Sequence, residues 1–397
     1  MYYLMNKDNI TASFSLGDDD LHTVCLIDKV TGNLPIGFTT IDAWIKDRRA
    51  SVYNGIVNHI MRETSYETAK GFIDMTHAIS INDTFWIKSN YEPDITWEQV
   101  SPYSKDNQFN ETVSKSIFLE DYYRHQENDC SYPIIAPELT AEGSYARCFV
   151  KGKDNIYLYK RGSSGASNSG REPYCEMLAS ELAQKICKKK SVIYDFATKY
   201  DISSSKCRLF TDEQYGFVPY SRICKDRRCS LSDILTYFED IGYGDEFRRM
   251  IVFDSVVFNT DRHMGNYGII IDNDTLEPLR MAPVFDFNLS LFPCSMREDY
   301  DDINKTMPFY CPSIGDDFIS NAKAVMTDDI MNDLKNLEGF RFLFRGDSIF
   351  ETWRIEALED MIDKEISAIE DKTIFHIDEV FLSDIQKDLP EESMAHD

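Results

Sequence analysis

The sequence has few of the features that mark a metal-binding or membrane-spanning chain. Its ten cysteines are scattered, without the Cys-x-x-Cys pairs or Cys/His clusters that structural zinc sites use. No apolar run approaches the length of a membrane span. The first seven residues contain no basic segment followed by an apolar core, as an export signal would. We therefore expect a cytoplasmic protein with free thiols, including the closely spaced Cys224 and Cys229.

Positive charge is also scarce. The 42 Lys and Arg residues are outweighed by 68 Asp and Glu residues, which gives a formal net charge of −26 at pH 7. Such a chain is repelled by nucleic acid and by anionic membrane surfaces, so we expect neither as a direct partner. The length of 397 residues, with 43% hydrophobic and 13% aromatic residues, indicates an ordered globular protein of two or three domains.

One segment carries the chemistry of phosphoryl transfer. Residues 259–266 read Asn-Thr-Asp-Arg-His-Met-Gly-Asn, and a further acid, Asp286, follows 20 residues after Asn266. Phosphoryl transfer needs a positioned nucleophile and cations held against the phosphates. We predict that Asp261 accepts the proton of a hydroxyl nucleophile and that Asn266 and Asp286 bind Mg²⁺, which prefers oxygen ligands. Arg262 is expected to fix the loop or a phosphate rather than to act chemically, and His263 to be an ordinary hydrogen-bonded loop histidine.

The flanking sequence predicts how these side chains meet. Apolar residues recur at helical spacing before Asp261, and a strand, a polar turn and a returning strand follow Asn266. A hairpin of this kind brings Asp286 back beside Asn266. The predicted helix, strand, turn and strand cover residues 246–258, 267–271, 272–275 and 276–284.

Residues 140–160 contain the elements that are needed to cover the phosphates of ATP. A loop of small residues with Gly143 and Ser144 precedes two predicted strands, 147–150 and 155–160, and the second ends at Lys160. The loop lacks a Gly-x-Gly-x-x-Gly pattern. A loop, two strands and a Lys nevertheless form the arrangement by which kinases cover the phosphates and direct an ammonium at them.

A helix follows a Gly/Ser-rich connector, residues 162–170. Pro173 stands where a first helical turn tolerates proline, and the helix is predicted to reach residue 188. Glu172 and Glu176 lie one turn apart, and either could pair with Lys160. We favour Glu176, because Glu172 is also placed to interact with the positive end of the helix dipole.

The rest of the chain is predicted in three regions. Residues 1–130 form an α/β region, with an amphipathic helix at 41–64, a strand at 84–87 and a polar loop at 104–114. Residues 131–222 form a small sheet with one helix. Residues 223–397 are mostly helical, with a core-facing helix at 348–370 and a polar, frayed tail at 387–397.

The order of these motifs resembles the HipA-like serine/threonine kinases. The motifs are Glu142-Gly143-Ser144, Tyr159-Lys160, Glu172-Pro173-x-x-Glu176-x-x-Ala179-Ser180, Asp261-Arg262-His263-x-x-Asn266 and Ala282-Pro283-Val284-Phe285-Asp286. They span residues 130–300. More loosely, residues 79–87 resemble a segment that precedes the kinase core in related proteins.

This resemblance implies an α+β, bilobal protein-kinase-like fold, with a small β-rich N-lobe, a mostly helical C-lobe and an N-terminal α/β extension. It implies ATP and Mg²⁺ as cofactors, with Asp261 as the catalytic base, Asn266 and Asp286 on the metal, and Lys160 on the phosphates. It further implies a regulatory serine in the phosphate loop, which is Ser144 here. The implied partners are a protein substrate with a Ser or Thr acceptor and an antitoxin-like regulatory protein.

Two other functions are compatible with these residues. Asp-Arg-His-x-x-Asn also occurs in phosphoinositide kinases, so a lipid or small-molecule kinase is one alternative, although the net charge of −26 opposes an anionic membrane. A non-catalytic binding module with a kinase shape is the other. The serines of the 162–170 connector are either sites of self-phosphorylation or parts of a simple linker.

Overall fold

The computed structural model describes residues 1–17, 25–50, 68–119, 135–141, 143, 145–224, 229–301 and 310–371. Three predictions fall partly or wholly outside these residues: Ser144, most of the helix predicted at 41–64, and the tail at 387–397. Among the described residues, no helix is both long and apolar enough to cross a membrane.

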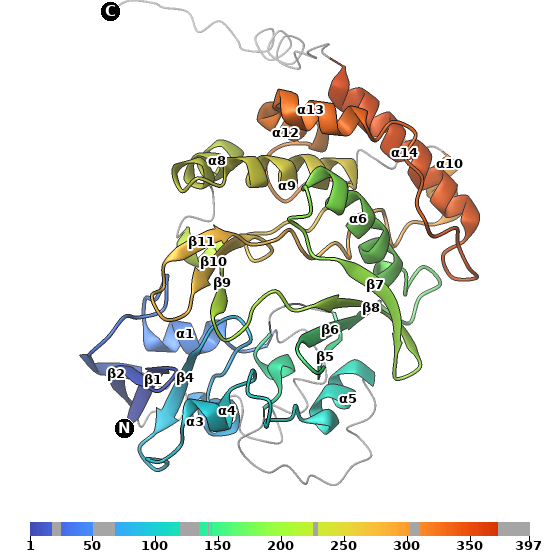
Figure 1. Ribbon diagram of the computed structural model, residues 1–397. Coiled ribbons are helices and arrows are strands. Elements are labelled where there is room, and N and C mark those ends of the chain that lie inside the picture. Colours follow the sequence, from blue (N-terminus) through green and yellow to red (C-terminus); the bar gives the residue numbers. More distant parts are fainter. Residues whose placement is uncertain are drawn as a thin grey trace, which may run out of the picture.

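The N-terminal region is a small sheet covered by short helices (Figure 1). Its four strands pair in the order β3-β2-β1-β4, and the inward side chains form a core with α1 and α3. Helix α1 begins after Thr40, whose hydroxyl accepts from the Ala43 amide, and it ends at Arg48. The elements are β1 (Tyr2–Asn6), β2 (Asn9–Leu16), β3 (Cys25–Val30), α1 (Ile41–Asp47), α3 (Ala69–Thr76), β4 (Phe85–Ser89), α4 (Trp97–Val100) and α5 (Glu111–Leu119).

A second antiparallel sheet and one long helix form the middle of the molecule. The strand order is β5-β6-β8-β7, and α6 packs on β6, β7 and β8. Helix α6 starts with Pro173 in its first turn, as predicted, and buries one continuous apolar face. The elements are β5 (Arg147–Lys151), β6 (Ile156–Arg161), α6 (Glu172–Ile186), β7 (Tyr194–Lys199) and β8 (Ile202–Arg208).

The C-terminal part combines a three-stranded sheet with a layer of helices (Figure 1). Its sheet has the order β11-β10-β9, so the hairpin predicted after Asn266 is confirmed. Helix α9 is buried along its length, and one hydrophobic core runs from α6 through α9 to α14. The elements are β9 (Tyr215–Pro219), α7 (Tyr220–Ile223), α8 (Leu231–Asp240), α9 (Gly244–Val256), β10 (Gly268–Asp272), β11 (Pro278–Met281), α10 (Arg297–Asp301), α12 (Phe318–Val325), α13 (Asp328–Lys335) and α14 (Thr352–Glu370).

Two sequence predictions are corrected. The polar segment 104–114 is not all loop, because α5 begins at Glu111, with Val113 and Ser114 turned into the protein. The prediction of free thiols is wrong for Cys224 and Cys229, which form a disulfide. A separation of only five residues allows the chain to bring the two sulfurs together.

Candidate functional site

The segment around Asp261 is a tight loop that leaves the end of α9. Phe258 adopts a left-handed backbone conformation, with φ of 53°, which turns the chain out of the helix. The Asn259 side chain then donates to Oδ1 of Asp254 at 2.9 Å and accepts from the Asp261 amide at 3.2 Å. The loop is therefore fixed by its own polar side chains on both sides of the turn.

Arg262 anchors this loop to two other segments. Its guanidinium makes a forked pair with Asp254, with Nε to Oδ2 at 2.8 Å and Nη2 to Oδ1 at 2.9 Å. Its Nη1 also donates to the carbonyl oxygens of Asn266, at 3.0 Å, and Phe285. Arg262 is 2% exposed, so these contacts are shielded from water. One side chain thus holds α9, the loop 259–266 and the segment before Asp286 together, which agrees with the expectation that Arg262 fixes the loop.

Asn266 and Asp286 both line the cavity that Asp261 also lines, and each has an oxygen-bearing side chain. The amide nitrogen of Asn266 donates to the Asp261 carbonyl at 2.9 Å, which leaves its amide oxygen available. Asp286 has φ of 62°, and its backbone amide donates to the Tyr194 hydroxyl at 3.2 Å. Among the described residues no group of three or more Asp, Glu, His or Cys side chains forms a complete metal cage. One amide oxygen and one carboxylate fit Mg²⁺, which commonly takes its remaining ligands from phosphate and water.

Lys160 stands between two carboxylates. Its ammonium is 2.7 Å from Oε1 of Glu176 and 2.7 Å from Oδ1 of Asp286. Burial opposes the charge on Lys160, but the two carboxylates outweigh it, so the pKa of Lys160 lies above its ordinary value. Ser205 also donates to Glu176 and fixes the orientation of that carboxylate. Lys160 is thus held in one place at the end of β6.

The two acids next to the ammonium respond differently to their surroundings. Burial raises the pKa of Glu176. Burial also acts to raise the pKa of Asp286, but the Lys160 ammonium overcomes it and the pKa lies below the usual value. The pKa of Asp261 is raised, first by burial and then by the nearby charge of Asp286. Asp261 is therefore the better proton acceptor of the two aspartates.

Glu172 and Gly143 have other surroundings. The structure does not bring Glu172 to Lys160, because Oε2 of Glu172 accepts from the Ser163 amide at 3.2 Å and so fixes the start of the connector. Gly143 has φ of 120°, and a Cβ there would lie 1.8 Å from Nη2 of Arg147. Gly143 therefore lets the guanidinium of Arg147 pack directly against the loop. His263 accepts from the Gly265 amide through Nδ1, as an ordinary loop histidine does.

A cavity of about 310 Å³ connects these groups. One end is polar and is lined by Lys160, Asp261, Asn266 and Asp286. The other end is mainly apolar and adjoins residues 208–211, which are the end of β8 and the first part of its connection to β9 and are called the hinge below. The apolar end is lined by Phe149, Leu158, Leu209, Phe210, Phe217 and Phe285. A cleft that is apolar at one end and charged at the other fits a ligand that combines a flat base with phosphates.

Two side chains at this site, those of Arg147 and Tyr194, were not predicted from the sequence. Arg147 lines the cavity, and its charge helps to lower the pKa of Asp286, after Lys160. Tyr194, on β7, supports Asp286 through the hydrogen bond described above, and its ring lies 5.5 Å from the Lys160 ammonium. Arg147 could have been predicted from its position directly after the loop of small residues that contains Gly143. Nothing in the local sequence points to Tyr194.

Comparison with solved structures identifies the architecture. HipA of Shewanella oneidensis MR-1, in a structure with HipB and its operator DNA, superposes with a TM-score of 0.53 at 11% sequence identity, over 92% of this chain and 97% of that one. The chain has a bilobal protein-kinase-like fold. The predicted fold class is therefore confirmed. In a fold of this kind β5–β8 and α6 correspond to the N-lobe, and β9–β11 with the following helices correspond to the C-lobe.

Other matches are weaker. The proinflammatory kinase CtkA of Helicobacter pylori gives a TM-score of 0.43 at 17% identity, over 56% of this chain and 90% of that one. A Golgi casein kinase gives 0.26 at 13% identity, over 57% of this chain and 69% of that one. No model of a known family and no curated protein matches the chain. At these identities the likeness to HipA concerns the fold alone.

Proposed function

We propose that this protein is an ATP- and Mg²⁺-dependent protein serine/threonine kinase of the HipA-like type. The observation that carries the proposal is the convergence, at the polar end of one cavity, of the Lys160–Glu176 ion pair with Asp261, Asn266 and Asp286. These are the residue types that phosphoryl transfer uses for orientation and charge stabilisation.

Each side chain has a separate task in the proposed reaction. The acceptor hydroxyl oxygen attacks the γ-phosphorus of ATP, the bond from that phosphorus to the bridging oxygen breaks, and ADP leaves. Asp261 orients the hydroxyl and takes its proton as the new bond forms. Lys160, held by Glu176, stabilises negative charge on the phosphates. Asn266 and Asp286 would hold Mg²⁺, which neutralises charge on the β- and γ-phosphates.

The direct test is transfer of labelled phosphate from ATP to a generic protein substrate and to the protein itself. The wild type is expected to incorporate label when Mg²⁺ is present, and Asp261→Asn to lose almost all of it. Asp240→Asn, an exposed acid at the end of α8, is the matched control and should behave like the wild type. Equal labelling by the wild type and Asp261→Asn would refute the proposal. Label found only in lipid vesicles or in small molecules would favour the alternative kinase class.

A non-catalytic binding module is separated by nucleotide binding. A kinase with an intact site should show a rise in melting temperature with ATP that depends on Mg²⁺, because ligand binding to the native state stabilises it. Binding without any transfer, unchanged in Asp261→Asn, would favour the module.

Self-phosphorylation and a regulatory partner extend the proposal. Ser144 and the connector serines are the candidate acceptors, and mass spectrometry after incubation with ATP would identify a modified peptide. The HipA structure contains HipB, which supports a search for a regulatory protein partner of this chain. Co-purification with proteins encoded beside it would test this, and the absence of any such complex would remove the partner from the proposal.

A further inference from the structure

The apolar end of the cavity is a preformed slot beside the hinge. Three phenylalanines pack against one another there: Phe210 and Phe217 at 5.6 Å between ring centroids, Phe210 and Phe285 at 5.1 Å, and Phe217 and Phe285 at 5.4 Å. The two pairs that include Phe217 are edge-to-face and the third is tilted, and such contacts hold aromatic rings in fixed orientations. The slot therefore has the shape and polarity for a planar base, but its rings cannot tell one purine from another.

The N-terminal region supplies part of the wall of this cavity. Ile81 and Asn82, from the segment before β4, line it together with the hinge. Ile81 is buried, whereas Asn82 is half-buried. Within the part of the chain that the structure describes, the side-chain amide of Asn82 makes no hydrogen bond. It is thus a polar group available to a ligand beside the apolar rings of this end.

The backbone of this segment is fixed to the hinge side. The carbonyl oxygen of Ile81 accepts from the hydroxyls of Tyr103 and Thr211, each at 2.6 Å, and that of Asn82 accepts from the Phe217 amide at 2.6 Å. A Cβ at Gly216 would lie 2.9 Å from the Asn82 carbonyl oxygen, so glycine permits this close approach. The backbone at Ile81 and Asn82 is therefore held by Thr211 of the hinge and by β9.

A buried ion pair fixes the same segment from the other side. Arg48, 1% exposed, contacts both carboxylate oxygens of Asp83 at 2.5 Å and donates to the carbonyl oxygens of Ala78 and Phe85 at 3.1 Å. Asp83 also accepts from the Phe85 amide at 2.9 Å. Because one guanidinium contacts the carboxylate through Nη2 and two carbonyl oxygens through Nη1, these charge-assisted contacts hold the segment closely in place.

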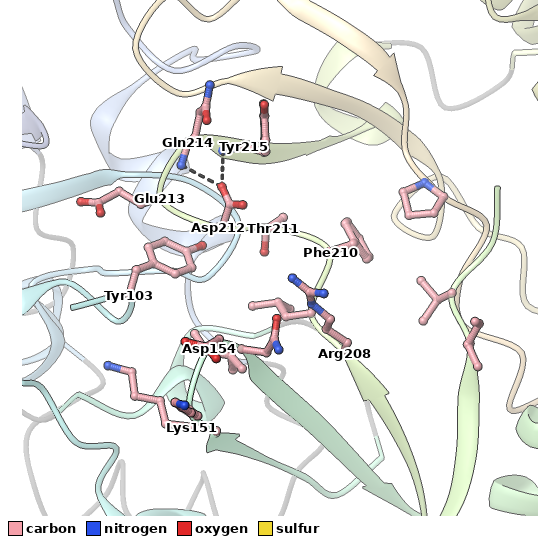
Figure 2. A pocket seen from close by; sticks show the side chains of 18 of the residues that line it. Tyr103, Lys151, Asp154, Arg208, Phe210, Thr211, Asp212, Glu213, Gln214 and Tyr215 are labelled. Atoms are coloured by element: carbon pink, nitrogen blue, oxygen red, sulfur yellow. Dashed lines mark hydrogen bonds between the residues drawn. The ribbon is translucent and has the colours of Figure 1, made fainter. Parts of the chain in front are cut away.

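Contacts beyond the segment join the N-terminal region to both lobes. Trp97 donates to Glu213 at 2.7 Å, and Lys151 donates to the carbonyl oxygens of Ser104 and, at 2.7 Å, Asn107. Lys7 pairs with Asp274 at 2.6 Å. Figure 2 shows Tyr103, Lys151 and the stretch from Arg208 to Tyr215 around a second cavity, of about 950 Å³, on this side of the hinge. The N-terminal region therefore makes direct contacts with the hinge side of the molecule.

We propose that the N-terminal region is part of the nucleotide site, and that Asn82 makes this protein select adenine over guanine. An amide offers one acceptor and two donors, which match the N6 amino group and the N7 ring nitrogen of adenine when that edge of the base faces Asn82. Guanine presents two acceptors, O6 and N7, along the same edge, so one of them would face the amide oxygen. This inference rests on the proposed function, because it takes ATP as the ligand.

The test compares the dissociation constants of ATP and GTP, with Mg²⁺, for the full chain by calorimetry. Asn82→Leu and Asn82→Ala should each weaken ATP binding about tenfold, as expected when one hydrogen-bonding partner of a desolvated group is lost. GTP binding should change by less than about twofold, so that the preference for ATP falls. Asn9→Ala, an exposed asparagine of the same region, is the control and should leave both constants unchanged.

The outcomes separate the two proposals. If the wild type binds ATP but both Asn82 variants keep its ratio of ATP to GTP affinity, the role of Asn82 is refuted and the proposed kinase stands. If the wild type binds neither nucleotide, both fail. Two replacements of different size guard against the loss of one variant to misfolding, and melting temperatures near that of the wild type would show that each is folded.

Discussion

Arg262→Lys tests whether the loop that carries Asp261 and the segment that carries Asp286 depend on one guanidinium. Arg262 makes four side-chain hydrogen bonds: two to Asp254 and one each to the carbonyl oxygens of Asn266 and Phe285. Lysine keeps the positive charge but presents a single point of contact, so it cannot span all four acceptors. The carbonyl oxygens are then left without donors, and the segments that carry Asn266 and Asp286 are free to shift.

The size of the effect follows from burial. Arg262 and Asp254 are 2% and 4% exposed, and breaking a buried ion pair costs about 3–5 kcal/mol. Lysine retains part of the attraction to Asp254, so we expect a loss of about 2–3 kcal/mol in the free energy of unfolding. A displacement of about 1 Å at reacting groups can cost about 100-fold in rate, and we expect kcat to fall by about that factor.

Denaturant unfolding and steady-state kinetics measure the two effects separately. Arg262 acts through other groups, so kcat should fall while the KM for ATP changes by no more than about threefold, because Lys160 and the apolar slot remain. Arg248→Lys is the control: this arginine, on α9, lies nearer the surface and should change stability by less than about 0.5 kcal/mol. A normal kcat in correctly folded Arg262→Lys would refute the positioning role.

Three further variants test the electrostatics of the structure. Glu176→Gln removes one of the two carboxylates on Lys160, and should weaken ATP binding and lower the transfer rate about tenfold while the Ser205 contact persists; an unchanged rate in a filter-binding assay would contradict this. Arg147→Met should weaken ATP binding about tenfold with less effect on adenosine, measured by calorimetry, because the guanidinium faces the phosphate end; equal loss for both ligands would argue against it. Glu365 is buried on α14, and burial raises its pKa to about 8. Between about pH 4.5 and 8 the native state therefore keeps a proton that the unfolded state releases. The free energy of unfolding falls as pH rises through this range. Glu365→Gln should remove this fall and stabilise the protein at pH 8 by up to about 4 kcal/mol in urea unfolding; a pH dependence equal to that of the wild type would refute the assignment.

The parts of the site that the sequence predicted are those with local determinants. Asp261 and Asn266 lie five residues apart, and the hairpin after them is closed by a turn in which Asp272 accepts from the amides of Asp274 and Thr275 at 2.9 Å. Such contacts are encoded within a few residues, as is the first turn of α6 at Pro173. The same holds for the two strands that lead to Lys160.

The parts that were missed depend on contacts between distant segments. Strand β1 pairs with β4, about 80 residues later, and Asn6 donates to the Asn273 carbonyl across 267 residues. Neither partner carries a local signal, because any strand edge of suitable polarity would satisfy the same backbone groups. For this reason the N-terminal region was predicted as an α/β region but not as a component of the hinge. Glu172 and Glu176 lie on one face of α6, so the sequence could only favour Glu176, and the tertiary structure pairs that residue with Lys160.

The net charge of −26 and the proposed binding of phosphates in the cavity are compatible because the charges involved act over different distances. At physiological ionic strength charges are screened over about 8 Å, so most surface carboxylates exert little force on a ligand once it is inside the cavity. Within the cavity the balance is reversed: four cationic side chains, Arg147, Lys160, Arg208 and Arg222, line it against two carboxylates, Asp261 and Asp286. Both carboxylates belong to the proposed chemistry of proton transfer and metal binding. The acidic surface therefore argues against extended polyanions such as nucleic acid or membranes, which must meet many surface charges at once, but not against a single nucleotide.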